Sequence, residues 1–309
     1  MTPYQAIAQK LEAGEAVILD GGTGTELERL GAPMHTDVWC AEALDSHPDL
    51  VQQVHINYIN AGADVITTNT YPTTRQVLQA AGLGHKFTEW NVKAVEIAKQ
   101  ARDQAAADRP VAIAGSVSRF ANMNYFELET ALANYRDQAK LLANNGVDLL
   151  LLELLGSRPE GIAPAIEAVL AAGLPVWVSL SCAEDRSSGT VMLGISESEK
   201  SADDRIFYCE FDQAVQQIAS SGFSALLMMH SELKTTSAAV TIMKENCAEP
   251  IGAYPNIGYW AEPNWAFVDT VEPADYVVEA KQWIASGAQI VGGCCGIGPD
   301  HIRALREGL

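Results

Sequence analysis

The sequence is poor in basic residues and in cysteine, and it has no long hydrophobic run; each shortage argues against a class of protein. Lysine and arginine number 20 against 39 aspartates and glutamates, so the formal net charge is −19. Because nucleic acids and anionic membrane surfaces are bound by cationic patches, neither is expected as a partner. The longest apolar runs fall well short of the roughly 20 residues that a membrane span requires, and no span is expected.

The N-terminus and the cysteines together predict a cytoplasmic protein. No basic region precedes an apolar one at the start of the sequence, so we expect no signal peptide. Six cysteines are too few for a disulfide framework in a chain of 309 residues, which indicates a reducing compartment. They are Cys40, Cys182, Cys209, Cys247, Cys294 and Cys295.

Short apolar runs alternate with longer segments of helical periodicity, and this alternation predicts the fold. Continuous apolar strands between helices are typical of a parallel sheet with both faces covered, and eight repeats match a (β/α)8 barrel, the TIM-barrel fold. A doubly wound sheet with fewer strands is the alternative. The expected strands are residues 16–21, 63–69, 111–116, 147–153, 176–182, 225–230, 251–256 and 289–294.

No linker or low-complexity segment divides the sequence, so we expect a single domain over residues 1–309. The most polar interval, residues 184–204, is expected to be a long loop after the fifth strand. Our hypothesis is that this loop covers a site at the strand ends.

The C-terminal ends of the strands form the site in a (β/α)8 barrel, and here they carry polar or metal-binding groups. Glu153 follows four leucines, and a carboxylate in so apolar a run normally meets a cation or a ligand. Asn69 and Ser116, taken alone, are explained equally well as the start of a polar loop. The strand-end residues are Asp20, Asn69, Ser116, Glu153, Cys182, His230, Asn256, Cys294 and Cys295.

The glycine-flanked pair Cys294 and Cys295 can turn both thiols toward one point. With His230 it forms a set of one imidazole and two thiolates, which suits Zn²⁺ and leaves a fourth position open, as in catalytic zinc sites. The alternatives are a core histidine at position 230, and a pair of buried thiols or a disulfide at positions 294 and 295. A phosphate site in the glycine turn is a further alternative, although it does not explain two cysteines.

Five motifs at the expected strand ends resemble the homocysteine S-methyltransferases, over essentially the whole chain. This family includes the betaine and S-methylmethionine enzymes and the homocysteine domain of cobalamin-dependent methionine synthase. The motifs are Asp20-Gly21-Gly22-Thr23-Gly24-Thr25-Glu26-Leu27, Thr67-Thr68-Asn69-Thr70-Tyr71, Leu152-Glu153, Tyr254-Pro255-Asn256 and Gly292-Gly293-Cys294-Cys295-Gly296.

The resemblance implies a (β/α)8 barrel in which a zinc ion, held by three cysteines, binds homocysteine as a thiolate that attacks a methyl group. The methyl group is carried by a sulfonium, an ammonium or cobalt. Cys294 and Cys295 match the last two zinc ligands, and Glu153 would take the amino group of the amino acid. The turn formed by Asp20, Gly21, Gly22 and Thr23 would line the same pocket. The full set of predicted substrate-binding residues is Asp20, Gly21, Gly22, Thr23, Asn69, Ser116, Glu153 and Asn256.

Three departures from the family pattern fall in the pocket. His230 stands where the family has its first zinc cysteine, Ser118 and Arg119 stand where relatives show Gly-Pro, and Ile257 replaces a small residue. Because imidazole is neutral and cysteinate is not, the zinc site without substrate becomes neutral. A bound thiol should then be more acidic, and its sulfur less nucleophilic.

We therefore predict a zinc-dependent methyltransferase that moves a methyl group from a small cationic donor to a thiol such as homocysteine, giving methionine. A chain of 309 residues leaves no room for a cobalamin or folate domain beside the barrel, so the donor is free unless a separate corrinoid protein docks. S-methylmethionine or S-adenosylmethionine ranks first, then betaine-like compounds. Aromatic faces for such a cation are Trp39, Tyr71, Trp177, Trp260 and Trp265.

Two other functions stay open, and so does assembly into a homo-oligomer. A phosphate-binding barrel lyase or isomerase needs cations after strands seven and eight, and the nearest, Lys281 and Arg303, lie outside the glycine turn. A non-catalytic zinc- or thiol-binding homologue would keep the metal ligands without turnover.

Overall fold

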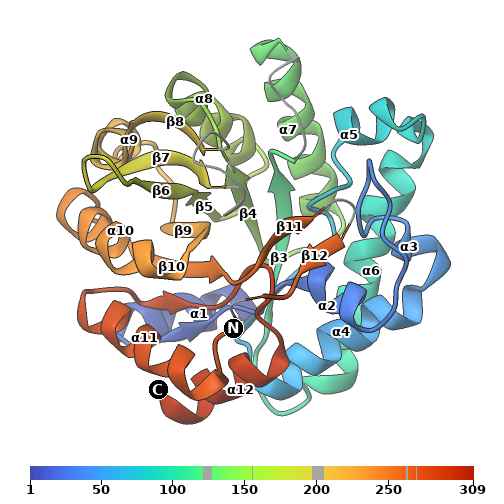
Figure 1. Ribbon diagram of the computed structural model, residues 1–309. Coiled ribbons are helices and arrows are strands. Elements are labelled where there is room, and N and C mark those ends of the chain that lie inside the picture. The colour runs from blue at the N-terminus through green and yellow to red at the C-terminus, as the bar shows by residue number, and fades with distance from the viewer. Residues whose placement is uncertain (121–126, 155, 197–204, 262–263, 269) are drawn as a thin grey trace.

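The computed structural model shows eight parallel strands arranged as a barrel and surrounded by helices (Figure 1). It describes the chain except for residues 121–126, 155, 197–204, 262–263 and 269. The strand order is β1-β13-β10-β9-β5-β4-β3-β2, and a parallel bridge between Leu19 and Val65 joins the two ends of this sheet. The predicted (β/α)8 barrel is confirmed. The doubly wound alternative is wrong, because such a sheet has two free edges.

All eight barrel strands lie within or across the predicted intervals, and the run at 251–256 agrees at both ends. The first and last strands are shorter than predicted, since glycine-containing turns follow them. The barrel strands are β1 (Val17–Ile18), β2 (Val65–Thr67), β3 (Ala112–Ser118), β4 (Leu149–Leu154), β5 (Val176–Leu180), β9 (Ala225–Glu232), β10 (Ile251–Asn256) and β13 (Ile290–Val291).

Helices cover the outside of the barrel (Figure 1). Local signals set their ends: Thr2 and Gln5 form a capping box at the first helix, and Gly62, with φ of +107°, ends the helix that begins at Pro48. None of the described helices is both long and apolar enough to cross a bilayer. They are α1 (Pro3–Glu12), α2 (Thr23–Arg29), α3 (Ala43–Ser46), α4 (Pro48–Ala61), α5 (Arg75–Ala80), η1 (Gly84–Lys86), α6 (Phe87–Ala105), α7 (Leu128–Asn144), α8 (Pro159–Leu170), α9 (Phe211–Ile218), α10 (Leu233–Asn246), α11 (Pro273–Ala285) and α12 (Pro299–Gly308).

Alternate residues of each strand fill two apolar layers, which explains why the strands are apolar throughout. On β4, Leu149 and Leu151 belong to the layer inside the barrel, together with Ile7 of α1. Leu150 and Leu152 belong to the larger layer between strands and helices. Since both faces of the sheet are covered, no position on β4 is left for a polar residue before Glu153.

The segment after β5 is not the long loop that the sequence predicts. It forms an antiparallel sheet of β6 (Cys182–Asp185), β7 (Thr190–Ser196) and β8 (Arg205–Glu210). Residues 197–204, between β7 and β8, lie outside the described part of the chain. Val191, Leu193 and Ile195 are buried on β7. Their period of two is the signal of a half-buried strand, and the polar residues around it concealed that signal.

Asp64, directly before β2, connects three parts of the chain at the N-terminal end of the barrel. Its carboxylate lies 2.9 Å from Nζ of Lys10 in α1 and 2.7 Å from Nη2 of Arg306 in α12. It also accepts a hydrogen bond of 3.0 Å from the backbone N–H of Ile18 in β1. The nearly buried carboxylate therefore joins the first and last helices to the place where the barrel closes.

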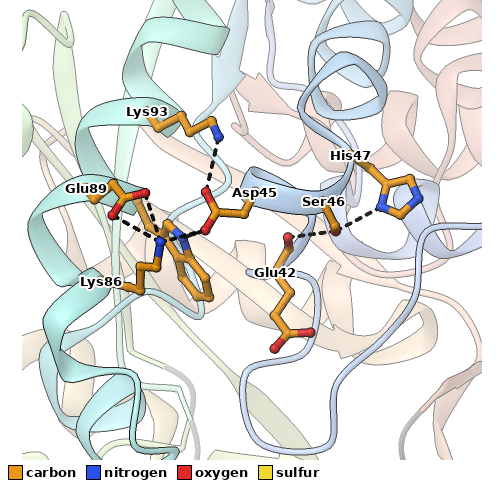
Figure 2. Close-up of polar contacts among 8 residues, drawn as sticks. Glu42, Asp45, Ser46, His47, Lys86, Glu89 and Lys93 are labelled. Atoms are coloured by element: carbon orange, nitrogen blue, oxygen red, sulfur yellow. Dashed lines mark hydrogen bonds and ion pairs between the residues drawn. The ribbon is translucent and has the colours of Figure 1, made fainter.

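A cluster of charges on the outside of the barrel joins α3 to α6 (Figure 2). The carboxylate of Asp45 accepts hydrogen bonds from Nζ of Lys86 at 2.9 Å, Nζ of Lys93 at 3.1 Å and Nε1 of Trp90 at 2.8 Å. Partial burial opposes ionisation of Asp45, but these hydrogen bonds outweigh it and lower its pKa to about 2. Thr36, Asp37, Trp39 and Cys40 line the central cavity described below. Because α3 begins three residues after Cys40, the cluster anchors one side of that cavity.

We expect Asp64→Asn to lower the free energy of unfolding by about 3 kcal/mol, because Lys10 and Arg306 would keep their charges and lose the buried partner. Urea unfolding followed by circular dichroism measures the change. Asp300→Asn is the control: it breaks an exposed pair with Arg303, and such pairs contribute less than about 1 kcal/mol. Equal losses in the two variants would contradict the role of Asp64.

His55 in α4 makes stability depend on pH. It is fully buried, and in the described structure neither ring nitrogen has a hydrogen-bond partner. Burial lowers its pKa from 6.5 to about 4, so between these values the unfolded chain binds a proton that the folded chain does not. As the pH falls through this interval, the free energy of unfolding should fall by about 3 kcal/mol on account of His55.

His55→Leu should remove this acid-dependent loss. Urea midpoints at several pH values between 4 and 7 measure it as a flatter pH profile. The control is His85→Leu at an exposed histidine, which should keep the profile of the parent. A His55→Leu profile as steep as that of the parent would show that burial of this imidazole is not the cause.

Candidate active site and metal centre

Three metal-binding side chains meet at the C-terminal ends of the sixth and eighth barrel strands, β9 and β13. Sγ of Cys294 lies 3.6 Å from Nδ1 of His230 and 3.9 Å from Sγ of Cys295. The ligand atoms of all three residues lie within 4.8 Å of one another. The structure therefore brings the three predicted zinc ligands together.

These distances fit a tetrahedral zinc ion. Zinc–sulfur bonds of about 2.3 Å and zinc–nitrogen bonds of about 2.0 Å, at tetrahedral angles, separate two sulfurs by about 3.8 Å and a sulfur from a nitrogen by about 3.6 Å. The corresponding distances here are 3.9 and 3.6 Å. Thiolate and imidazole are also the ligand types that zinc prefers, so both geometry and chemistry suit the metal.

Parallel pairing of three strands brings His230 and Cys294 to the same level along the barrel axis. Ala253 of β10 pairs with Met228 of β9 and with Val291 of β13. His230 lies two residues beyond Met228, and Cys294 three residues beyond Val291. The ligands thus extend from second-neighbour strands toward the same point.

Glycines bring the end of β13 close to its neighbours. A Cβ atom on Gly293 would lie 2.1 Å from Cγ2 of Ile297, and one on Gly292 would lie 2.7 Å from Cβ of Leu19. Both contacts are too short for a side chain, so the turn that carries Cys294 requires glycine at these positions.

His230 adopts a backbone conformation that is rare for a residue with a side chain, with φ of +40°. Its ring meets Trp265 edge-on, with centroids 5.7 Å apart. Trp265 lies on β12 (Asn264–Ala266), which pairs with β11 (Tyr259–Ala261), and its Nε1 donates to the carbonyl of Ile257 at 2.9 Å. The β11–β12 hairpin therefore orients the imidazole, and backbone strain of this kind is typical of functional positions.

The two cysteines differ in acidity. Their mutual hydrogen bond lowers the pKa of Cys294 well below its ordinary value, and the neighbouring His230 lowers it further. The same contact, together with burial, raises the pKa of Cys295 well above its ordinary value. One thiolate is thus already favoured, which prepares the pair for a cation.

A cavity of about 520 Å³ opens beside the three ligands at the C-terminal ends of the strands. This volume lies within the range of roughly 300–1,000 Å³ that is usual for small-molecule sites. Aromatic rings form much of its wall, and Trp39 and Tyr71 contact Phe120 with centroid distances of 6.4 and 5.3 Å. The cavity therefore offers π faces close to potential metal ligands.

Two buried acids in the cavity wall resist ionisation. Burial raises the pKa of Glu153 to about 8, although Ser116 and Tyr254 both donate hydrogen bonds to its carboxylate. Burial likewise raises the pKa of Asp20 to about 7, against two hydrogen bonds from Thr67. A cationic ligand would favour the charged form of either acid.

The predicted substrate-binding residues separate into two groups. Ser116 and Asn256 are absent from the described wall of the cavity. Ser116 is fully buried behind Glu153, and Asn256 donates to the carbonyl of Gly258 at 3.2 Å. The predicted residues that do line the cavity are Asp20, Gly21, Gly22, Thr23, Asn69 and Glu153.

The predicted aromatic residues also differ in position. Trp39, Tyr71 and Trp265 line the cavity. Trp177 instead fills the apolar layer inside the barrel, because its position on β5 faces inward. The side chain of Trp260 lies outside the described residues.

Sequence reasoning missed several residues of the wall. Tyr254 donates to Glu153 at 3.2 Å, and alternation along β10 places it and Asn256 on one face, so it could have been chosen with Asn256. A second set of missed residues comes from the turn after β3 and from the β6–β8 sheet, where no strand was expected. They are Arg119, Phe120, Ile195, Ile206 and Tyr208.

Comparison with known proteins identifies the family of the chain. The sequence model of the homocysteine S-methyltransferases matches residues 17–309. The chain belongs to this family. The selenocysteine methyltransferase of Astragalus bisulcatus is 29% identical over 331 residues, covering 95% of this chain and 92% of that protein. The homocysteine S-methyltransferase of Escherichia coli is 28% identical over 328 residues, covering 99% of each chain.

A solved structure agrees with the barrel. The metallated form of the homocysteine methyltransferase MmuM from Escherichia coli superposes with a TM-score of 0.76 at 27% identity and covers 99% of each chain. Membership of the family confirms that the chain is of the methyltransferase class. It favours methyl transfer over the phosphate-binding lyase or isomerase.

Proposed function

We propose that this chain transfers a methyl group from a small sulfonium donor to the thiol of homocysteine, at a zinc ion held by His230, Cys294 and Cys295. The agreement of the two distances from Sγ of Cys294 with a tetrahedral zinc site carries the proposal. All three ligand atoms lie within 4.8 Å of one another. A bound zinc ion lowers the pKa of a ligating thiol and so supplies a thiolate near neutral pH.

The transfer is a displacement at the methyl carbon. The acceptor sulfur gives an electron pair to this carbon while the bond from carbon to the donor sulfur breaks. The donor sulfur keeps the electrons of that bond and leaves as a neutral thioether, and the thiol proton passes to solvent. With homocysteine as the acceptor, the product is methionine.

Glu153 is suited to hold the ammonium group of the acceptor. Its carboxylate is fixed by Ser116 and Tyr254, and its raised pKa of about 8 means that an arriving cation would drive ionisation and release a proton. Binding of the amino acid would thus be coupled to loss of one proton from the protein.

The aromatic rings of the wall are suited to the donor. Phe120 packs against both Trp39 and Tyr71, and all three rings line the cavity. Their faces attract a cationic methyl group. This supports S-methylmethionine or S-adenosylmethionine as the donor, with betaine-like ammonium compounds as the second choice.

The zinc content of the protein tests the ligand set. We expect about one zinc ion per chain in the parent protein, and much less in His230→Ala and Cys294→Ser, with methyl transfer lost in parallel. Cys247→Ser, outside the cavity, is the control and should keep both. Elemental analysis after purification without chelator gives the answer. Turnover by zinc-free protein, or a parent that takes up no zinc under reducing conditions, would refute the proposal.

Glu153→Gln tests the acceptor site. Glutamine keeps the shape and can accept one of the two hydrogen bonds while its amide NH2 donates to the other hydroxyl. It cannot neutralise an ammonium group, so we expect KM for homocysteine to rise about tenfold or more. With 4-mercaptobutanoate, which lacks the amino group, parent and variant should differ much less. The exposed Glu160→Gln is the control. An unchanged KM for homocysteine would remove Glu153 from the acceptor site.

A further inference from the structure

Arg119 is the single lysine or arginine among the described residues that line the cavity. The carboxylate side chains there are Asp20, Asp37 and Glu153. A guanidinium is charged at every pH at which the protein is folded, and its planar set of donors matches a carboxylate. One cation in an otherwise acidic wall indicates where an anionic part of a ligand lies.

Arg119 lies nearer the mouth of the cavity than the acceptor site. It directly follows β3, three residues beyond Ser116, whose hydroxyl contacts the Glu153 carboxylate. A strand rises about 3.3 Å per residue, so the backbone of Arg119 lies about 10 Å further along β3 than that of Ser116. Its N–H donates to the carbonyl of Glu153 at 2.9 Å, which fixes this segment to β4.

The guanidinium of Arg119 lies in the part of the cavity wall nearest the mouth, away from the proposed zinc ligands. A Cβ atom on Gly156 would lie 3.6 Å from its Nη1 and 3.2 Å from Cγ2 of Ile195. It therefore lies where the loop after β4 meets β7. The zinc ligands follow the sixth and eighth strands of the barrel, whereas Arg119 follows the third, so a ligand must extend across the cavity to reach both.

The residue after Arg119 belongs to the aromatic group. Phe120 contacts both Trp39 and Tyr71, so a surface for a cation lies next to a group for an anion. A molecule with an onium group and a carboxylate a few bonds apart matches this pair of features.

We propose that Arg119 binds the carboxylate of the methyl donor and thereby selects donors that are zwitterions of an onium group and a carboxylate. This inference rests on the proposed function. The onium group lies against Trp39, Tyr71 and Phe120, with its methyl group directed toward the acceptor sulfur. Arg119 thus determines specificity and takes no part in the bond changes.

The test compares S-methylmethionine with its methyl ester, which has the same sulfonium and no carboxylate charge. In the parent, kcat/KM should be higher for the acid, and in Arg119→Gln the ratio of acid to ester should fall about tenfold or more, the effect of one charge-assisted hydrogen-bonded pair. Arg119→Lys should keep part of the preference. Arg303→Gln, at an exposed arginine of α12, is the control and should match the parent.

Two results would overturn the inference: an acid-to-ester ratio in Arg119→Gln equal to that of the parent, or a rise in KM for homocysteine with no change in that ratio. The second result would assign the guanidinium to the acceptor. If Arg119→Gln does not fold, Arg119→Lys with a native circular dichroism spectrum carries the comparison.

Failure of the proposed function is seen separately, as absence of transfer from every donor by the zinc-loaded parent. Calorimetric titration with S-methylmethionine in the absence of a thiol then still tests the arginine. Arg119→Gln should bind it about tenfold more weakly than the parent, and equal affinities would overturn the inference.

Discussion

The parallel register of β9, β10 and β13 is the constraint on which the site depends. β10 pairs with both neighbours through Ala253, so the ends of β9 and β13 come to the same height with one strand between them. Neighbouring strands lie about 4.8 Å apart, so His230 and Cys294 reach toward each other across two such spacings. A shift of one residue in β13 would turn its side chains to the opposite face and remove a thiol from the site.

The sequence predicted the barrel because its strands are buried on both faces. Runs such as residues 149–152 have no polar position, and a polar residue at the end of such a run is conspicuous. Glu153, His230 and the cysteine pair were found for this reason. Ser116 and Asn256 were predicted on the same grounds, but Ser116 lies within β3 and donates to Glu153 on the neighbouring strand, and Asn256 donates to the carbonyl of Gly258.

The β6–β8 sheet could not be found by the same argument. Its strands are not apolar throughout: β6 ends in Glu184 and Asp185, and β8 begins with Arg205 and ends with Glu210. A turn at Gly189, where φ is +73°, separates β6 from β7. Side chains in the cavity that come from such additions, among them Ile195 and Tyr208, depend on pairing between strands rather than on any local pattern. The fold and the cluster of His230, Cys294 and Cys295 follow from the sequence more directly than the shape of the pocket does.

The cavity thus combines two kinds of structure. The cluster of His230, Cys294 and Cys295 lies with Glu153 toward the C-terminal ends of barrel strands, which pairing with their neighbours holds in register. Much of the remaining wall comes from additions to the barrel: residues 36–40, anchored by Asp45, the β6–β8 sheet and the β11–β12 hairpin. Changes in the additions leave the strand register intact, so the barrel can keep the cluster of His230, Cys294 and Cys295 constant while the additions vary the rest of the pocket. Arg119 lies where β3 meets the outer wall of the cavity. A change of residue at this position would therefore change the charge of the cavity.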